Sequence, residues 1–177
     1  MKQKPKIGIS RCLLGDAVRY DGQAKPNPFI IEKLSELFEL IPVCPEVEAG
    51  LSVPRPPVQL TGSITSPRLT GRDDASIDIT EIMVEYCSRK IQTLNDLHGF
   101  IFKSRSPSCG LHSTPVFIDG QAISDNSRGI FAGSMRETYP GLPMIEDSDL
   151  EDPELYQQFV SAITTQKKAG NAHLRKT

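Results

Sequence analysis

The chain has 177 residues, of which 38% are hydrophobic and 24% charged, and its formal net charge is −2. These values are typical of one globular domain, so we expect a single domain over residues 1–177 with its own hydrophobic core. The charge gives no support for nucleic-acid binding, and no apolar run of about 18 residues predicts a membrane span. Because no apolar segment follows the basic start, we expect no secretion signal and a cytoplasmic location with reduced cysteines.

The first half of the chain is expected to hold two strands, one helix and a long loop. Lys6–Ser10 and Glu39–Val43 are short apolar runs that predict strands. Between them, Pro28–Phe38 has apolar residues at helical spacing, with Asn27 as the N-cap. The segment Val47–Ala75 is rich in proline and glycine, so we expect it to be irregular and to form a lid or pocket wall.

The second half alternates in the same way. Helices are predicted over Thr80–His98, Arg128–Thr138 and Pro153–Lys168, and strands over Phe100–Lys103 and Leu142–Ile145. Strands separated by helices or long connections favour a parallel sheet covered on both faces. The expected fold is therefore α/β, with a mostly parallel, Rossmann-like sheet of four or five strands flanked by helices.

Three of the four cysteines follow predicted strand ends. Cys12, Cys44 and Cys109 come after the first three strands, although 32 and 65 residues separate them along the chain. Parallel sheets bind ligands beyond the carboxyl ends of their strands, so we expect the three thiols to meet at one rim. Cys87 lies within a predicted helix on an apolar face, and we expect it to be a core residue.

Several kinds of site are compatible with three thiols at one rim. Structural zinc usually takes four ligands, often from CxxC pairs, and no such pair occurs here. A disulfide is disfavoured in a reducing compartment, and ordinary buried cysteines remain an alternative. An iron–sulfur cluster held by three cysteines would keep one iron open for a substrate.

Three sequence motifs carry a family resemblance. Ser10–Gly15 with Val18–Gly22, then Cys44–Leu51 with Arg55, then Ser106–Gly110 are similar to the motifs of the thiouracil desulfidase family, formerly a family of unknown function. These motifs lie within about residues 6–111. The basic tail at about 169–177 lies outside them.

The resemblance implies a cofactor and a reaction. It implies a 4Fe–4S cluster with three cysteine ligands, Cys12, Cys44 and Cys109, and one open iron. It also implies a non-redox, hydrolytic cleavage that removes sulfur from a thiolated, thiouracil-like pyrimidine and releases sulfide. Glu46 maps to the acid–base carboxylate. The assisting hydroxyl maps to Ser106, with Ser108 as the alternative.

Other assignments stay open on sequence grounds. The chain could instead be a non-catalytic iron–sulfur or zinc-binding accessory protein in sulfur metabolism or nucleic-acid thiolation. Arg19 and Tyr20 are candidates to line the pocket, Arg55 could anchor the long loop or bind substrate, and His112 could approach the cysteine rim. Neither a serine-hydrolase elbow nor a phosphate-binding glycine loop is present, and nothing in the sequence indicates an oligomeric state.

Overall fold

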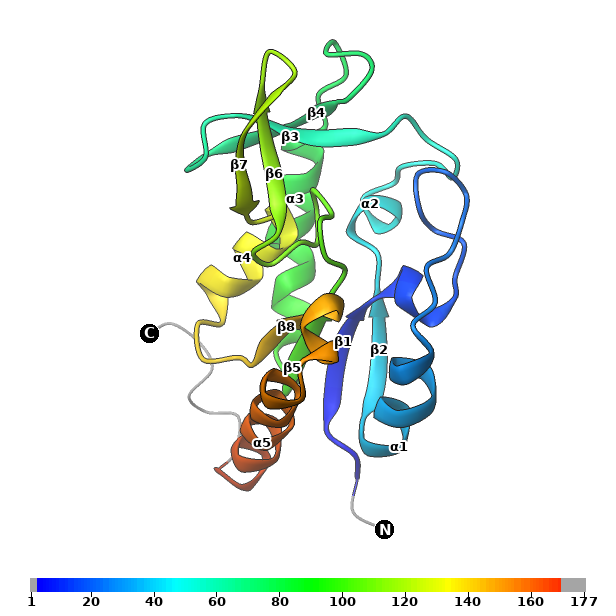
Figure 1. Ribbon diagram of the computed structural model, residues 1–177, viewed down its shortest axis with the longest axis vertical. Helices are drawn as coiled ribbons and strands as arrows, with labels where there is room; N and C mark the ends of the chain where they lie inside the picture. Colours follow the sequence, from blue (N-terminus) through cyan, green and yellow to red (C-terminus); the bar gives the residue numbers. More distant parts are fainter. Residues whose placement is uncertain (1–2, 170–177) are drawn as a thin grey trace.

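The computed structural model describes residues 3–169 and contains a parallel sheet at its centre (Figure 1). Strands β1 (Lys6–Ser10), β2 (Glu39–Val43), β5 (Gly99–Phe102) and β8 (Met144–Glu146) pair in the order β2-β1-β5-β8. All three pairings are parallel. The predicted α/β fold with a mostly parallel four-stranded sheet is confirmed.

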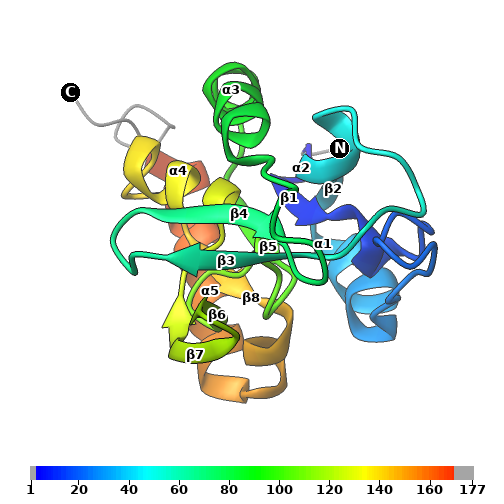
Figure 2. The same ribbon diagram turned by 90° about the horizontal axis from the view of Figure 1, so that it is seen from above.

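Helices cover both faces of this sheet (Figure 2). One face packs against η2 (Ile30–Leu34), α1 (Ser35–Leu37) and α5 (Pro153–Ala169), through buried residues such as Ile7, Ile9, Leu34 and Phe159. The other face packs against α3 (Thr80–Lys90) and α4 (Ile130–Thr138). The central strands β1 and β5 are mostly apolar because both of their faces are buried, whereas the edge strand β2 is only partly buried.

Aromatic packing fixes α4 on the sheet. Phe100 and Phe102 of β5 stack with their ring centroids 4.2 Å apart. Phe131, in the first turn of α4, packs edge-on against both rings, at 5.7 and 6.2 Å. All three side chains are completely buried, so the start of α4 has a well-defined position relative to the end of β5.

A second sheet, absent from the sequence prediction, lies beyond the carboxyl ends of the first (Figure 1). It has the order β4-β3-β6-β7, with the bounds β3 (Val58–Gly62), β4 (Pro67–Gly71), β6 (Thr114–Ile118) and β7 (Gln121–Ser127). Leu60, Leu69 and Val116 of this sheet are fully buried in the same cluster as Phe100. The two sheets therefore share one hydrophobic core.

The expectation that Val47–Ala75 is irregular is wrong. It contains the antiparallel hairpin of β3 and β4, in which Leu60 pairs with Leu69 and both are buried. The strands are short and bounded by proline and glycine, which masked their alternating pattern. Part of the expectation holds, because Arg55, Pro57, Val58 and Arg72 of this segment line a cavity.

The predicted helices exist but differ in extent. Thr80–His98 is helical only to Lys90, followed by a 3₁₀ turn, η3 (Ile91–Leu94). Pro28–Phe38 forms a π-helical turn followed by the short α1, and the Asn27 side chain caps it by accepting from the N–H of Ile30. The basic tail lies beyond residue 169 and so outside the described residues. No helix in the described part of the chain is both long and apolar enough to cross a membrane.

Candidate active site

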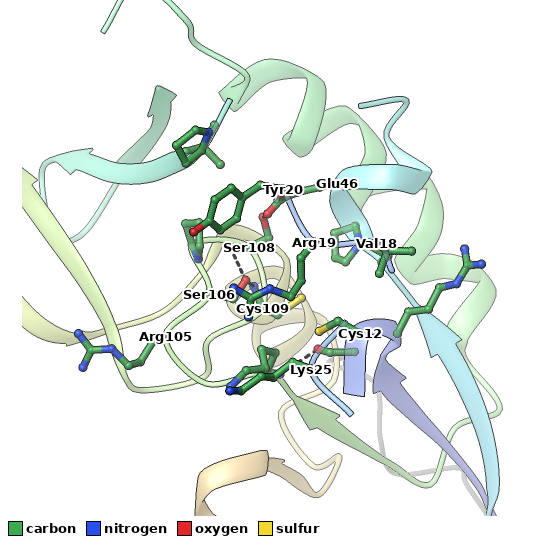
Figure 3. A pocket seen from close by; sticks show the side chains of 18 of the residues that line it. Cys12, Val18, Arg19, Tyr20, Lys25, Glu46, Arg105, Ser106, Ser108 and Cys109 are labelled. Carbon is green, nitrogen blue, oxygen red and sulfur yellow. Dashed lines mark hydrogen bonds between the residues drawn. The ribbon is translucent and has the colours of Figure 1, made fainter. Parts of the chain in front are cut away.

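The three cysteines meet where the carboxyl ends of the first three parallel strands converge. Cys12 lies in the 3₁₀ turn η1 (Arg11–Leu14) after β1, Cys44 directly precedes α2 (Pro45–Glu48) after β2, and Cys109 lies in the loop after β5. Because β1 lies between β2 and β5 in the sheet, these three ends are neighbours. All three cysteines line one cavity of about 450 Å³. Figure 3 shows Cys12 and Cys109 in this cavity.

The loop that carries Cys109 is held by the start of α4. Backbone N–H groups there donate to the loop carbonyls: Gly129 to Gly110 (2.8 Å), Ile130 to Pro107 (3.1 Å), and Phe131 and Ala132 to Ser108 (3.0 and 3.2 Å). The hydroxyl of Ser106 accepts from the N–H groups of Ser108 and Cys109 at 3.3 and 3.0 Å. These hydrogen bonds fix the backbone of the loop on both sides of Cys109.

Gly129 permits this close approach. A Cβ at this position would lie 2.5 Å from the carbonyl carbon of Ser108 and 2.8 Å from the nitrogen of Cys109. Its φ of −65° is ordinary for any residue, so steric contact alone selects glycine here. Sequence reasoning missed this residue, although a glycine just before a predicted helix is a recognisable signal.

The environment makes all three thiols weak acids in the absence of a metal. Burial and the neighbouring Cys44 together raise the pKa of Cys12 to about 11, although Lys103 and Arg19 act in the opposite direction. Burial also raises the pKa of Cys44 and that of Cys109, and Cys109 is affected by both other cysteines. The three sulfurs are therefore close enough for their charges to interact, and without a metal these thiols are poor nucleophiles.

The spacing of the sulfurs argues against a single metal ion. Three sulfurs on one zinc ion, with Zn–S bonds of about 2.3 Å, would lie roughly 3.8 Å apart. Among the described residues, the three cysteine sulfurs do not form a set lying within 4.8 Å of one another. A four-iron cluster binds each cysteine to a different iron and so needs a wider spacing. The all-sulfur donor set fits such a cluster.

Glu46 is a buried carboxylate at the wall of the same cavity. Its Oε1 accepts a hydrogen bond from the hydroxyl of Ser108 at 2.8 Å. Its Oε2 accepts from Nε of Arg55 at 2.7 Å, and the two side chains form an ion pair that is 11% and 7% exposed. Because each carboxylate oxygen can accept more than one hydrogen bond, Glu46 keeps acceptor capacity toward the cavity.

Arg55 anchors the loops around Glu46. Besides the ion pair, its guanidinium donates to the carbonyls of Ser52 (3.2 Å) and Val18 (3.1 Å), and its backbone N–H donates to Tyr20 (2.9 Å). Of the two roles open from the sequence, the contacts favour anchoring. These hydrogen bonds also connect the second motif, which contains Arg55, to the loop of the first motif, which contains Val18 and Tyr20.

The two candidate serines have different positions. Ser108 is 1% exposed, and its hydroxyl donates its hydrogen bond to Glu46. Ser106 is half-buried and lines the cavity, and within the described residues its O–H has no acceptor. All six predicted site residues line the same cavity: Cys12, Cys44, Glu46, Ser106, Ser108 and Cys109.

Cationic side chains surround this cavity (Figure 3). Arg19 and Arg72 lie over the ring of Tyr20, at 5.8 and 6.0 Å from its centroid. Arg19 and Tyr20 are thus pocket residues, as the sequence suggested. Sequence reasoning missed several other basic lining residues, whose segments had no recognised motif: Lys25, Arg72, Lys103 and Arg105.

Three further ionisable side chains do not line this cavity. Glu48 accepts from the N–H of Cys44 (3.0 Å) and from the hydroxyl of Tyr86 (3.0 Å), and so braces the second cysteine. Cys87 is 2% exposed within the core, as expected. His112 is not a lining residue of the cysteine cavity, and its ring contacts Asp149 instead.

Comparisons with known proteins agree with this geometry. The family model described as 2-thiouracil desulfurase matches residues 7–147. A solved structure of TudS, a 4Fe–4S-dependent thiouracil desulfidase, aligns with a TM-score of 0.65 and 26% identity, covering 88% of this chain and 99% of that one. The uncharacterized protein YbbK of Bacillus subtilis (strain 168) is 30% identical over 155 residues, which is 82% of this chain and 98% of that protein. This chain belongs to the 2-thiouracil desulfurase family.

Proposed function

We propose that this protein is an iron–sulfur-dependent desulfidase that hydrolyses the thiocarbonyl of a thiolated pyrimidine without redox chemistry. Cys12, Cys44 and Cys109 would hold a 4Fe–4S cluster that keeps one iron free of protein ligands. The observation that carries the proposal is that Glu46 opens into the same cavity as the three thiols. A metal-binding rim and a general base therefore face the same space.

When bound, such a cluster would supply a soft Lewis acid for the sulfur of the substrate. The protein supplies the rest of the chemistry. Arg55 and Ser108 hold the Glu46 carboxylate in one orientation, and its buried position limits competition from bulk water. The basic side chains around the rim balance the negative charge of thiolates and leaving sulfide.

Glu46 is positioned to transfer a proton from water to the departing sulfur. It accepts a proton from a water molecule, and the water oxygen forms a bond to the thiocarbonyl carbon. The carbon–sulfur bond then breaks as the added hydroxyl becomes the carbonyl. The proton held by Glu46 goes to the departing sulfur, and the remaining hydroxyl proton follows through the freed Glu46 carboxylate, so that hydrogen sulfide leaves. The balance is thiocarbonyl plus water to carbonyl plus hydrogen sulfide, so no electron donor or acceptor is needed.

The serines divide their roles in this proposal. Ser108 is a positioning residue, because it contacts Glu46 and is nearly inaccessible. Ser106 would donate a hydrogen bond to the substrate, since its hydroxyl hydrogen is available at the cavity surface. The family resemblance likewise favours Ser106 over Ser108 as the assisting hydroxyl.

The accessory-protein alternative has less support. A structural zinc site needs closely spaced ligands, which the three cysteines do not provide. A structural zinc site would also not explain why Arg55 and Ser108 hold the Glu46 carboxylate in place beside the thiols. We expect the protein to act on a free small molecule in a reducing cytoplasm, which agrees with four free cysteines.

The test is an anaerobic assay of sulfide release from 2-thiouracil and 4-thiouracil. Wild-type protein with its cluster should release sulfide, and Glu46→Gln should lose at least about 100-fold in rate while it keeps the same iron content. Glu36→Gln, an exposed carboxylate on α1, is the matched control and should retain full activity. If Glu46→Gln turns over normally, the assignment of the base is wrong. A cluster-loaded wild type that releases no sulfide would favour the accessory role.

A further inference from the structure

A second group of metal-binding side chains lies at the end of β8. Glu146 is the last residue of that strand, Asp149 lies in the 3₁₀ turn η4 (Asp147–Glu151), and His112 follows Cys109 by three residues. One ligand atom from each lies within 4.8 Å of the other two. Nε2 of His112 is 2.7 Å from Oδ2 of Asp149 and 3.7 Å from Oε2 of Glu146.

Glu146 has one satisfied and one unsatisfied oxygen. Oε1 accepts from three successive backbone N–H groups and one hydroxyl: Leu111 (2.6 Å), His112 (3.0 Å), and Ser113 through its N–H (3.2 Å) and Oγ (2.9 Å). The side chain is 0% exposed. The Glu146 side chain also accepts the N–H of Asp149 in a capping box, yet Oε2 itself has no hydrogen-bond partner.

An unsatisfied oxygen on a buried carboxylate is costly, and proteins rarely leave one without a reason. Here Oε2 lies 3.7 Å from Nε2 of His112, in the same group as the second carboxylate. A cation between the three groups would remove the cost. The charge of two carboxylates and one imidazole matches a divalent ion.

We infer that His112, Glu146 and Asp149 form a binding site for a divalent cation of the zinc class. One imidazole nitrogen and two carboxylate oxygens are ligands that zinc and its neighbours accept, with water completing the shell. Ligand atoms about 2.1 Å from one ion lie roughly 3.4 Å apart, so the 2.7 Å contact between His112 and Asp149 must open by about 0.7 Å. The 55% exposed imidazole has room to make that movement.

The site would stabilise the segment that follows Cys109. The same carboxylate that offers Oε2 to the ion holds the backbone of Leu111, His112 and Ser113 with Oε1. A bound ion would fix both Glu146 and the His112 side chain, and so the end of the third motif. This inference does not depend on the desulfidase proposal, because it concerns residues outside the cysteine cavity.

The test is calorimetric titration of zinc into the anaerobic, cluster-loaded full-length protein. Wild type should bind about one zinc ion per chain, and His112→Ala and Asp149→Asn should each weaken binding at least about tenfold. Glu151→Gln, an exposed carboxylate on the same turn, is the matched control and should bind as wild type does. Iron content is measured for every variant, so that zinc uptake by vacated cysteines is recognised.

Two results would overturn the inference. One is zinc affinity in both His112→Ala and Asp149→Asn equal to that of wild type at unchanged iron content. The other is no zinc binding by the wild-type protein, in which case His112 and Asp149 form an ordinary ion pair.

Discussion

Replacing Gly129 by alanine should displace the Cys109 loop without touching a single proposed ligand. The added Cβ would lie 2.5 Å from the carbonyl carbon of Ser108 and 2.8 Å from the nitrogen of Cys109. These distances fall short of ordinary contact, which begins at 3.4 Å, by about 0.9 and 0.6 Å. Both contacts are with backbone, which cannot rotate away as a side chain can.

The size of the effect follows from the packing. Overpacking of this kind costs about 1–3 kcal/mol, and for a domain of this size 1 kcal/mol corresponds to roughly 2–4 °C in Tm. At about 2 kcal/mol, the middle of this range, we expect Gly129→Ala to lower Tm by about 4–8 °C. Since metal sites tolerate displacements of only about 0.5 Å, cluster loading should fall below about half of the wild-type value.

The assay combines thermal unfolding with iron and acid-labile sulfide content after anaerobic reconstitution. Gly133→Ala is the matched control on the same helix, because its Cβ would meet only the Cβ of Arg128 at 4.0 Å. That variant should load normally and should be slightly more stable, since alanine favours a helix interior. If Gly129→Ala also loads and melts like wild type, α4 does not position the Cys109 loop and our reasoning about it is refuted.

Three further predictions test other parts of the site. Ser108→Ala should lower the rate of sulfide release about tenfold or more at unchanged iron content, because Glu46 loses its donor. Ser106→Ala should lower the rate, because the substrate loses its donor, and should also lower the iron content, because the N–H groups of Ser108 and Cys109 lose their acceptor. Arg55→Met leaves a buried carboxylate without its counter-ion and should cost about 3 kcal/mol in the free energy of unfolding, measured by denaturant titration. Burial, the largest single effect, lowers the pKa of His112, but the hydrogen bond to Asp149 and the charges of Glu146 and Asp149 together outweigh it and raise the pKa. The stability from this pair is therefore complete below about pH 6.5 and is lost as pH rises through the raised pKa; in metal-free buffer His112→Ala should cost more at pH 5.5 than at pH 9, and an equal cost at both would contradict it.

The sequence was informative where a local pattern determines the position of a residue. The strand that ends before Cys12 is a mostly apolar run, as expected of a strand buried on both faces. Since parallel strands share a carboxyl edge, the convergence of Cys12, Cys44 and Cys109 could be predicted without coordinates. Glu46 came from the family resemblance, and its place two residues after Cys44 agrees with its position in the same cavity.

The second sheet was missed for a physical reason. Its strands are short, and the pairing that joins its two hairpins, β3 with β6, spans a long sequence distance and leaves little local signal. One signal was nevertheless present: Asp119 and Gly120 both have positive φ and form the tight turn between β6 and β7, which is the classic composition of a two-residue hairpin turn.

Other features of the site depend on contacts that no local pattern encodes. The partnership of Glu46 with Arg55 and Ser108 joins residues 9 and 62 positions apart. The support of the Cys109 loop by Gly129 depends on how α4 packs against β5 through Phe131. Tertiary packing alone creates these relations.

The most direct test of the central claim is the iron content of anaerobically reconstituted cysteine variants. We predict about four irons per chain for wild type and for Cys87→Ser, whose thiol belongs to the core. Cys12→Ser, Cys44→Ser and Cys109→Ser should each lose most of the iron. Full iron loading in any one of these three, or loss of iron specific to Cys87→Ser, would contradict a cluster held by the three converging thiols.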